Sequence, residues 1–327
     1  MTPGRRALLA AAVGLAPLGH VLAQAGAEPY PSRPLRIVVP YPPGAVNDAA
    51  ARLLAHHLAP ALGQPVVVEN RPGAGGHLGA EQVARSAPDG HTLVIGTSGL
   101  ITIGPHLYRR LAYDPQKDLV PVYRFATVPY AFGVPPSLGL KTVHDLVALA
   151  KARPGALNFA SSGNGSVPHL CGELFNMVAG VKMVHVPYKG GAQAMNDVAT
   201  GAVHLYCGGI PSMLGLVRAG RLQWLGVTAA RRSPLLPDEP TMAEQGLPRL
   251  EVNSWVGLHA PGGTPAGILR RLAGEIAKVM QTDEMRRQMG LLGADAESIG
   301  PDRFAALIRD ESRWWAEVVR VSGAKVD

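Results

Sequence analysis

Cysteine is scarce in this sequence: its 327 residues contain two, Cys171 and Cys207. Neither lies in a spacing typical of metal ligands, so we expect no metal site and no cofactor. An oxidising compartment would permit a disulfide between them. Two buried free thiols would fit the sequence equally well. Cysteine content therefore excludes a disulfide-rich scaffold but leaves the state of these two residues open.

Aromatic residues and basic tracts are also scarce. Aromatics make up 5% of the chain, and the Lys and Arg residues behind the net charge of +7 occur singly or in pairs such as Arg231-Arg232. Nucleic-acid surfaces concentrate basic residues on one face or in one segment. Sugar sites stack rings on aromatic side chains. The composition argues against both ligands and is compatible with a small acidic one.

No apolar run is long enough to span a bilayer. Residues 1–27 instead have the features of a signal peptide: the basic pair Arg5-Arg6, an apolar stretch over 7–18, and small residues suitable for cleavage near 23–27. We therefore expect an exported protein.

Motifs of hydrolytic enzymes are missing as well. There is no GxSxG or HExxH sequence, and the histidines, among them His169, His185 and His204, lack metal-ligand spacing. We expect the protein not to be an enzyme, and an exported hydrolase is the weakest of the alternatives considered.

Two strand–loop–helix units stand out among what is present. A predicted strand at 35–39 leads through 40–48 into a helix that ends at Gly63. A second strand at 157–160 leads through the Ser- and Gly-rich segment 161–166 into a helix with Ser166 as N-cap. Asn47 or Asp48 would cap the first helix. Free N–H groups and the dipole make a helix N-terminus suited to anions, so both loops are candidate anion sites.

The alternation of strands and helices predicts an α/β protein. The pattern divides into two lobes, with residues 28–126 and 226–327 in lobe 1 and residues 127–225 in lobe 2. The two loops would then face each other across a cleft.

Ordered motifs over the whole mature chain resemble one known family. They include VVPYPPGAVND, VVVENRPGAGG, NFASSGNGS, HVPYKGG and SWVGLHAP. In this order they are similar to the Bug family (TctC-like), the extracytoplasmic solute receptors of tripartite tricarboxylate transporters. The resemblance implies a type II-like periplasmic binding protein that captures a small organic acid, a carboxylate or an amino acid. It also implies membrane transporter subunits as partners and a monomeric receptor. A solute sensor that reports to a membrane signalling partner is the alternative.

The resemblance also places the ligand-binding residues. They lie on the first loop, after the strand at 91–97, on the second loop, and on a flanking wall: Tyr41, Gly44, Ala45, Asn47, Asp48, Thr97, Ser98, Ser161, Ser162, Asn164, Gly165, Ser166, His169, Tyr188, Lys189, Gly190 and Cys207. Several positions depart from the family pattern. Ala45 replaces a common glycine, Asn47 a common Thr or Ser, and His77 and Gly104 each a common asparagine. Cys207-Gly208 stands where the family often carries a Phe-Asp pair. These departures bear on which ligand is accepted and not on the fold.

Overall fold

The structure is a computed structural model that describes residues 30–326. The predicted signal peptide at 1–27 and its cleavage site lie outside this range. Within residues 30–326, no helix is both long and apolar enough to cross a membrane.

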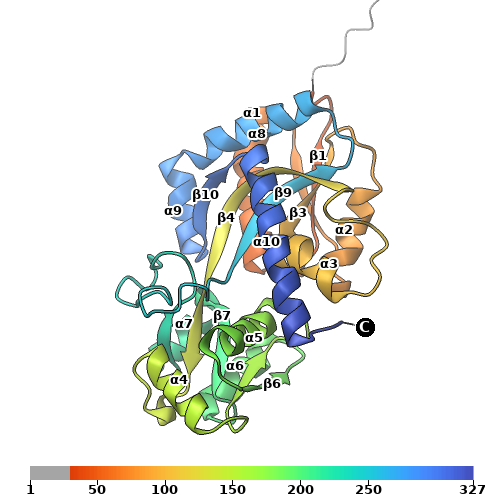
Figure 1. The fold of residues 1–327 in the computed structure, drawn as a ribbon. Helices are drawn as coiled ribbons and strands as arrows, with labels where there is room; N and C mark the ends of the chain where they lie inside the picture. The colour runs from red at the N-terminus through yellow and green to blue at the C-terminus, as the bar shows by residue number, and fades with distance from the viewer. Residues whose placement is uncertain (1–29, 327) are drawn as a thin grey trace, which may run out of the picture.

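The upper half of the molecule in Figure 1 is built on parallel strands with helices on both faces. Strand β1 lies between β2 and β3, and β9 runs antiparallel beside β3. Side chains alternate along these strands. Ile37 and Val39 enter the core beneath α1 and α8, whereas Val38 enters the core beneath α2 and the C-terminal helix α10 (Pro301–Ser322). The elements of this half are β1 (Leu35–Val39), α1 (Val46–Leu62), β2 (Val66–Asn70), α2 (His77–Ala84), β3 (Thr92–Thr97), α3 (Gly104–Leu107), β9 (Asn253–Pro261), α8 (Ala266–Met280), α9 (Asp283–Leu291) and β10 (Asp295–Ile299).

The lower half repeats this arrangement on a smaller scale. Parallel strands β5 and β6 pair with each other, and β5 also pairs with β7. Phe159 of β5 packs under α4 and α5, while its neighbour Ala160 packs on the opposite face under α6 and α7. The elements are α4 (Val143–Ala152), β5 (Asn158–Ser161), α5 (Val167–Ala179), β6 (Val184–Pro187), α6 (Gly191–Thr200), β7 (Leu205–Gly209), α7 (Ile210–Arg218) and β8 (Gln223–Val227).

Strand β4 (Leu119–Val134) runs through both halves, as Figure 1 shows. It pairs with β9 as far as Pro129 and with β7 from Tyr130 onward. The two halves therefore share one hydrogen-bonded path of strands, in the order β2-β1-β3-β9-β4-β7-β5-β6. The chain crosses between the halves along β4 and returns after β8. The lobe limits at 126/127 and 225/226 stay a prediction.

Helix α10 (Pro301–Ser322) also joins the halves. Phe304 and Ile308 pack in the upper half, and Trp315 and Val318 pack with α5 in the lower half. In Figure 1 the dark-blue helix crosses from one half to the other, and the C-terminus emerges beside α5. The core of the lower half is thus completed by a helix that belongs to the last part of the chain.

Candidate functional site

A cavity of about 430 Å³ lies where the two halves meet. Its walls come from the first loop (residues 40–48), the second loop (residues 161–166) and the C-terminal tail. The segment after β2, the end of β3 with the turn that follows, β4 and β9 complete them. The lining residues are Tyr41, Asn47, Gly75, His77, Thr97, Gly99, Gly104, Leu107, Tyr108, Tyr130, Ser162, Asn164, Gly165, Ser166, Val167, Ser254 and Val326. None of these is Asp, Glu, Lys or Arg. The wall is polar and uncharged.

Other cavities are larger but lie elsewhere. One of about 490 Å³ is lined by Arg231, Arg232 and Arg286. Two of these arginines are already paired, Arg232 with Glu244 and Arg286 with Asp283. A carboxylate there would compete with existing ion pairs, and neither predicted loop contributes to the wall. We therefore take the uncharged cavity as the candidate site.

The first loop is ordered by Asp48. Its Oδ2 accepts the backbone N–H of Gly44 at 3.0 Å and Nε of Arg52 at 3.1 Å, and its Oδ1 accepts Nδ2 of Asn70 at 2.8 Å. Burial would raise the pKa of Asp48, but these hydrogen bonds and the charge of Arg52 outweigh it and hold that pKa below its usual range. Asp48 is 3% exposed and does not line the cavity. Its carboxylate fixes the loop and is not available to a ligand.

The N-cap of α1 is Ala45, so the prediction that Asn47 or Asp48 caps this helix is wrong. Ala45 has φ −68°, a conformation that any residue adopts, and the positive φ of 85° falls on Gly44. Alanine at residue 45 therefore introduces no backbone strain. Because no side chain caps α1, its first N–H groups are left for a ligand.

The second loop is held by hydrogen bonds within the loop and to two histidines outside the cavity wall. Ser166 is the N-cap of α5, as predicted: its hydroxyl accepts the N–H of His169 and donates to the carbonyl of Gly163 at 2.7 Å. His169 Nδ1 accepts the N–H of Gly165 at 3.0 Å, and the Ser161 hydroxyl lies 2.6 Å from Nε2 of His185. Ser162, Asn164, Gly165 and Ser166 are thereby turned toward the cavity.

Two stacked imidazoles support this loop. The rings of His169 and His185 are 3.8 Å apart at 17°. The pKa of each is lowered to about 4, in His169 by burial and in His185 by burial together with the nearby His169. Both are therefore neutral near pH 7, which leaves His169 Nδ1 free of a proton and able to accept from Gly165.

Seven predicted residues line the cavity: Tyr41, Asn47, Thr97, Ser162, Asn164, Gly165 and Ser166. The Tyr41 hydroxyl lies 2.6 Å from Oγ1 of Thr97 and joins two of its walls. Others lie just behind the wall, namely Gly44, Ala45, Asp48, Ser98, Ser161 and His169. Ser98 is fully buried, with its hydroxyl directed to the Ser254 hydroxyl at 3.4 Å.

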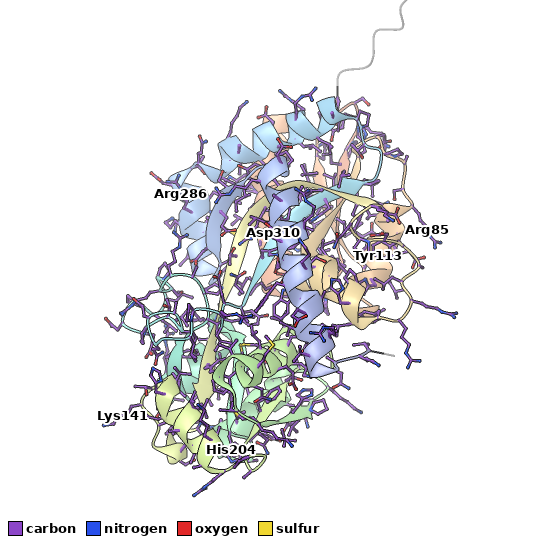
Figure 2. All side chains as sticks on the ribbon, in the orientation of Figure 1. Arg85, Tyr113, Lys141, His204, Arg286 and Asp310 are labelled. Atoms are coloured by element: carbon purple, nitrogen blue, oxygen red, sulfur yellow. A yellow bond between two sulfur atoms is a disulfide. The ribbon has the colours of Figure 1, made fainter. Side chains whose placement is uncertain are left out.

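The predicted flanking wall does not line this cavity. The Tyr188 hydroxyl donates to Asp197 at 2.7 Å, and Lys189 and Gly190 are not among the lining residues. Cys207 is 2% exposed and forms a disulfide with Cys171, their Cα atoms 6.3 Å apart. Figure 2 draws this bond in yellow in the lower half. The disulfide was one of the two alternatives that the sequence left open.

Several lining residues were not predicted as ligand-binding. Gly99–Ile103 forms a π-helical turn that leads into α3, and this pair brings Gly99, Gly104, Leu107 and Tyr108 to the cavity. One available signal was that β3 ends beside β1, where ligands of open α/β sheets bind. The other was that Gly104 is among the positions marked above as bearing on ligand choice. Val326 reaches the cavity through the returning C-terminal tail, for which the sequence carries no local signal.

Comparison with known proteins assigns the family. Residues 50–323 match the model of the tripartite tricarboxylate transporter family receptor. BugT of Bordetella pertussis is 38% identical over 319 residues, which cover 95% of this chain and 98% of BugT. The chain belongs to this receptor family. A family of solute receptors also accounts for the missing catalytic motifs.

Solved structures of similar proteins confirm the predicted fold class of the receptor. An R. palustris protein solved with adipate has a TM-score of 0.79 at 36% identity, with 90% of this chain and 99% of that chain covered. MatC from Rhodopseudomonas palustris, solved with bound malate, has a TM-score of 0.74 at 34% identity, covering 89% and 100%. The periplasmic binding protein BugD has a TM-score of 0.74 at 33% identity, covering 90% and 99%. The α/β, two-lobed binding-protein architecture is therefore shared.

Proposed function

We propose that this receptor captures a small organic acid in the uncharged cavity between its halves. One observation carries the proposal: the cavity contains the uncapped start of α1 and the loop before α5, with no Asp, Glu, Lys or Arg side chain in its wall. N–H groups and the helix dipole stabilise an anion at such positions. The hydroxyl group of Ser162 and the amide groups of Asn47 and Asn164 add further donors.

A carboxylate without an amino group fits this wall better than an amino acid. An ammonium group needs an anionic or strongly accepting partner. The nearest predicted acid, Asp48, is engaged by Arg52, Asn70 and Gly44. The adipate and malate in the two R. palustris structures are acids of the proposed kind.

The remaining predicted residues keep supporting roles in this proposal. Gly44, Ala45, Asp48, Ser98, Ser161 and His169 position the loops, while Tyr188, Lys189, Gly190 and Cys207 lie outside the cavity wall. The lobes close on the ligand by bending near the middle of β4 and after β8, where the chain crosses between the halves, and α10, which packs against both halves, moves with them. We propose a monomer that is exported to the periplasm and delivers its ligand to the transporter's membrane subunits.

A thermal-shift screen followed by calorimetric titration tests this function. The panel contains mono- and dicarboxylates, the matched amino acids, and glucose as a neutral sugar. A ligand at 100 times its Kd adds about 2.7 kcal/mol to the free energy of unfolding, a shift that is easily measured. Binding of at least one simple acid without binding of glucose supports the proposal. Tight binding of the sugar and of no acid would overturn it.

A further inference from the structure

His77 is a buried polar residue in the cavity wall that neither loop supplies. It is the first residue of α2, is 6% exposed, and lines the cavity. Its ring packs edge-on against Tyr108 with the ring centroids 4.7 Å apart. Its Nδ1 lies 3.1 Å from the hydroxyl of Tyr113. Within residues 30–326, no hydrogen bond involves its Nε2.

The ring occupies space that Gly104 leaves open. A Cβ added at Gly104 would lie 2.6 Å from Nε2 and 2.8 Å from Cε1 of His77. These distances are shorter than real Cβ contacts. A side chain at residue 104 and an imidazole at residue 77 therefore exclude each other in this conformation.

The hydrogen bond to Tyr113 selects the tautomer of His77. Figure 2 shows Tyr113 on the side of the upper half that carries α2 and α3. Tyr113 is 7% exposed, and burial raises the pKa of its hydroxyl, which stays protonated. Within the described residues, Nδ1 of His77 is the acceptor available to that hydroxyl. A buried O–H needs an acceptor, so Nδ1 accepts and the ring proton of neutral His77 lies on Nε2.

We propose that His77 is a specificity-determining residue whose Nε2–H donates to a second acceptor group of the ligand. The inference rests on the proposed function, in which the loops hold the first carboxylate. A donor at this wall favours an acid that carries a second carboxylate over the monocarboxylate of the same length. It disfavours a ligand whose second group is an ammonium, because Nε2–H cannot accept from it.

Calorimetric titration with two matched pairs of acids tests the inference. The pairs are succinate with butanoate and adipate with hexanoate, and the quantity compared is the ratio of Kd values within each pair. The variants are His77→Asn, whose amide is too short to reach the position of Nε2, and His77→Gln, whose amide nitrogen replaces it. His56→Asn, an exposed residue of α1, is the matched control.

We expect the preference for the dicarboxylate to fall about 10- to 100-fold in His77→Asn, the range of a hydrogen bond to a charged group. His77→Gln restores most of it, and His56→Asn leaves it unchanged. If the ratio of Kd values within each pair is the same in wild type and His77→Asn, this inference is overturned and the proposed function is left intact. A wild type that binds neither member of either pair, or any other acid, would overturn both.

A measurement on the unaltered protein covers the case in which both variants fail to fold. Two-bond ¹H–¹⁵N correlation spectra of ¹⁵N-histidine-labelled receptor distinguish the two tautomers. The inference predicts a neutral ring protonated at Nε2 whose resonance shifts with the dicarboxylate much more than with the matched monocarboxylate. Protonation at Nδ1, or equal shifts with both acids, would contradict it.

Discussion

The backbone N–H of Val326 donates to the carbonyl oxygen of Leu107 at 3.1 Å, and this contact ties the C-terminal tail to the wall of the cavity. The tail lies parallel to the chain at Tyr108. The side chains of Val326 and Leu107 then meet the second loop at Gly165, where an added Cβ would lie 2.5 Å from Val326 and 2.9 Å from Leu107. The tail, the turn after β3 and the second loop form one packed corner of the site.

Gly165→Ala is expected to disturb this corner. Residue 165 has φ 76°, which disfavours alanine, and the new methyl group displaces the tail. We expect a loss of more than about 1 kcal/mol in the free energy of unfolding and weaker binding of acids. Gly139→Ala is the control, because Gly139 has φ 64° with nothing within 4 Å of an added Cβ. Chemical denaturation and titration check both variants. Equal losses would show that the contact with the tail is unimportant.

Asp48→Asn is expected to loosen the first loop. The pKa of Asp48 is lowered in the folded state, so its stabilisation is present above the usual carboxylate range and is lost as the pH falls through it. We expect about 1–3 kcal/mol less stability near pH 7 and a smaller loss on acidification than in the wild type. Asp310→Asn is the control, because Asp310 pairs with Arg313 on the exposed face of α10 and should change stability by less than about 0.5 kcal/mol. Equal effects of the two substitutions would contradict the loop-fixing role.

The stacked histidines make the second loop sensitive to acid. Both have folded pKa values of about 4, below the usual 6.5, so the unfolded chain binds protons that the native protein does not. The free energy of unfolding then falls with decreasing pH between these values, by up to about 1.4 kcal/mol per pH unit for each histidine. Glu173, 3.8 Å from Nε2 of His169, is the acid that faces the pair.

His169→Asn tests this dependence, because an amide oxygen can still accept the N–H of Gly165 but does not titrate. Its stability should change less than that of the wild type between pH 6.5 and pH 4, when measured by urea denaturation at several pH values. His56→Asn should follow the wild type. An unchanged pH dependence in His169→Asn would show that folding does not lower the pKa of His169.

The disulfide should matter for stability and not for ligand affinity. Cys171 and Cys207 are 36 residues apart in sequence, and closing a loop of that size contributes roughly 2–4 kcal/mol. We expect Cys171→Ala/Cys207→Ala to lose this amount and to keep its Kd for acids within about twofold, since Cys207 lies outside the cavity wall. A large loss of affinity in a folded double variant would show that Cys207 contributes to ligand binding.

Local patterns in the sequence were sufficient to predict the two loops. β-branched runs such as Leu35–Val39 identified strands, and Ser166 with Pro168 marked a helix start, because these signals act within a few residues. The seven predicted residues that line the cavity were placed by the resemblance to the receptor family. The local signals did not reveal which residue caps α1, because the carboxylate of Asp48 accepts hydrogen bonds from Asn70 and Arg52 instead.

What the sequence did not predict depends on contacts between distant segments. The return of Val326 to Leu107, the packing of His77 against Gly104 and the pairing of Cys171 with Cys207 each join residues from different elements. The short elements α9 (Asp283–Leu291) and β10 (Asp295–Ile299) were also missed. Strand β10 is defined by its pairing with β4 and carries no run of β-branched residues.

A crystal structure of the receptor with the tightest-binding acid from the screen tests the central claim most directly. We expect one carboxylate at the first N–H groups of α1 and beside Ser162 and Ser166, with no Lys or Arg side chain in contact. We expect a second acceptor group of the ligand at Nε2 of His77. A ligand held instead by Arg231, Arg232 and Arg286 in the other cavity, or a carboxylate paired with a cationic side chain, would contradict it.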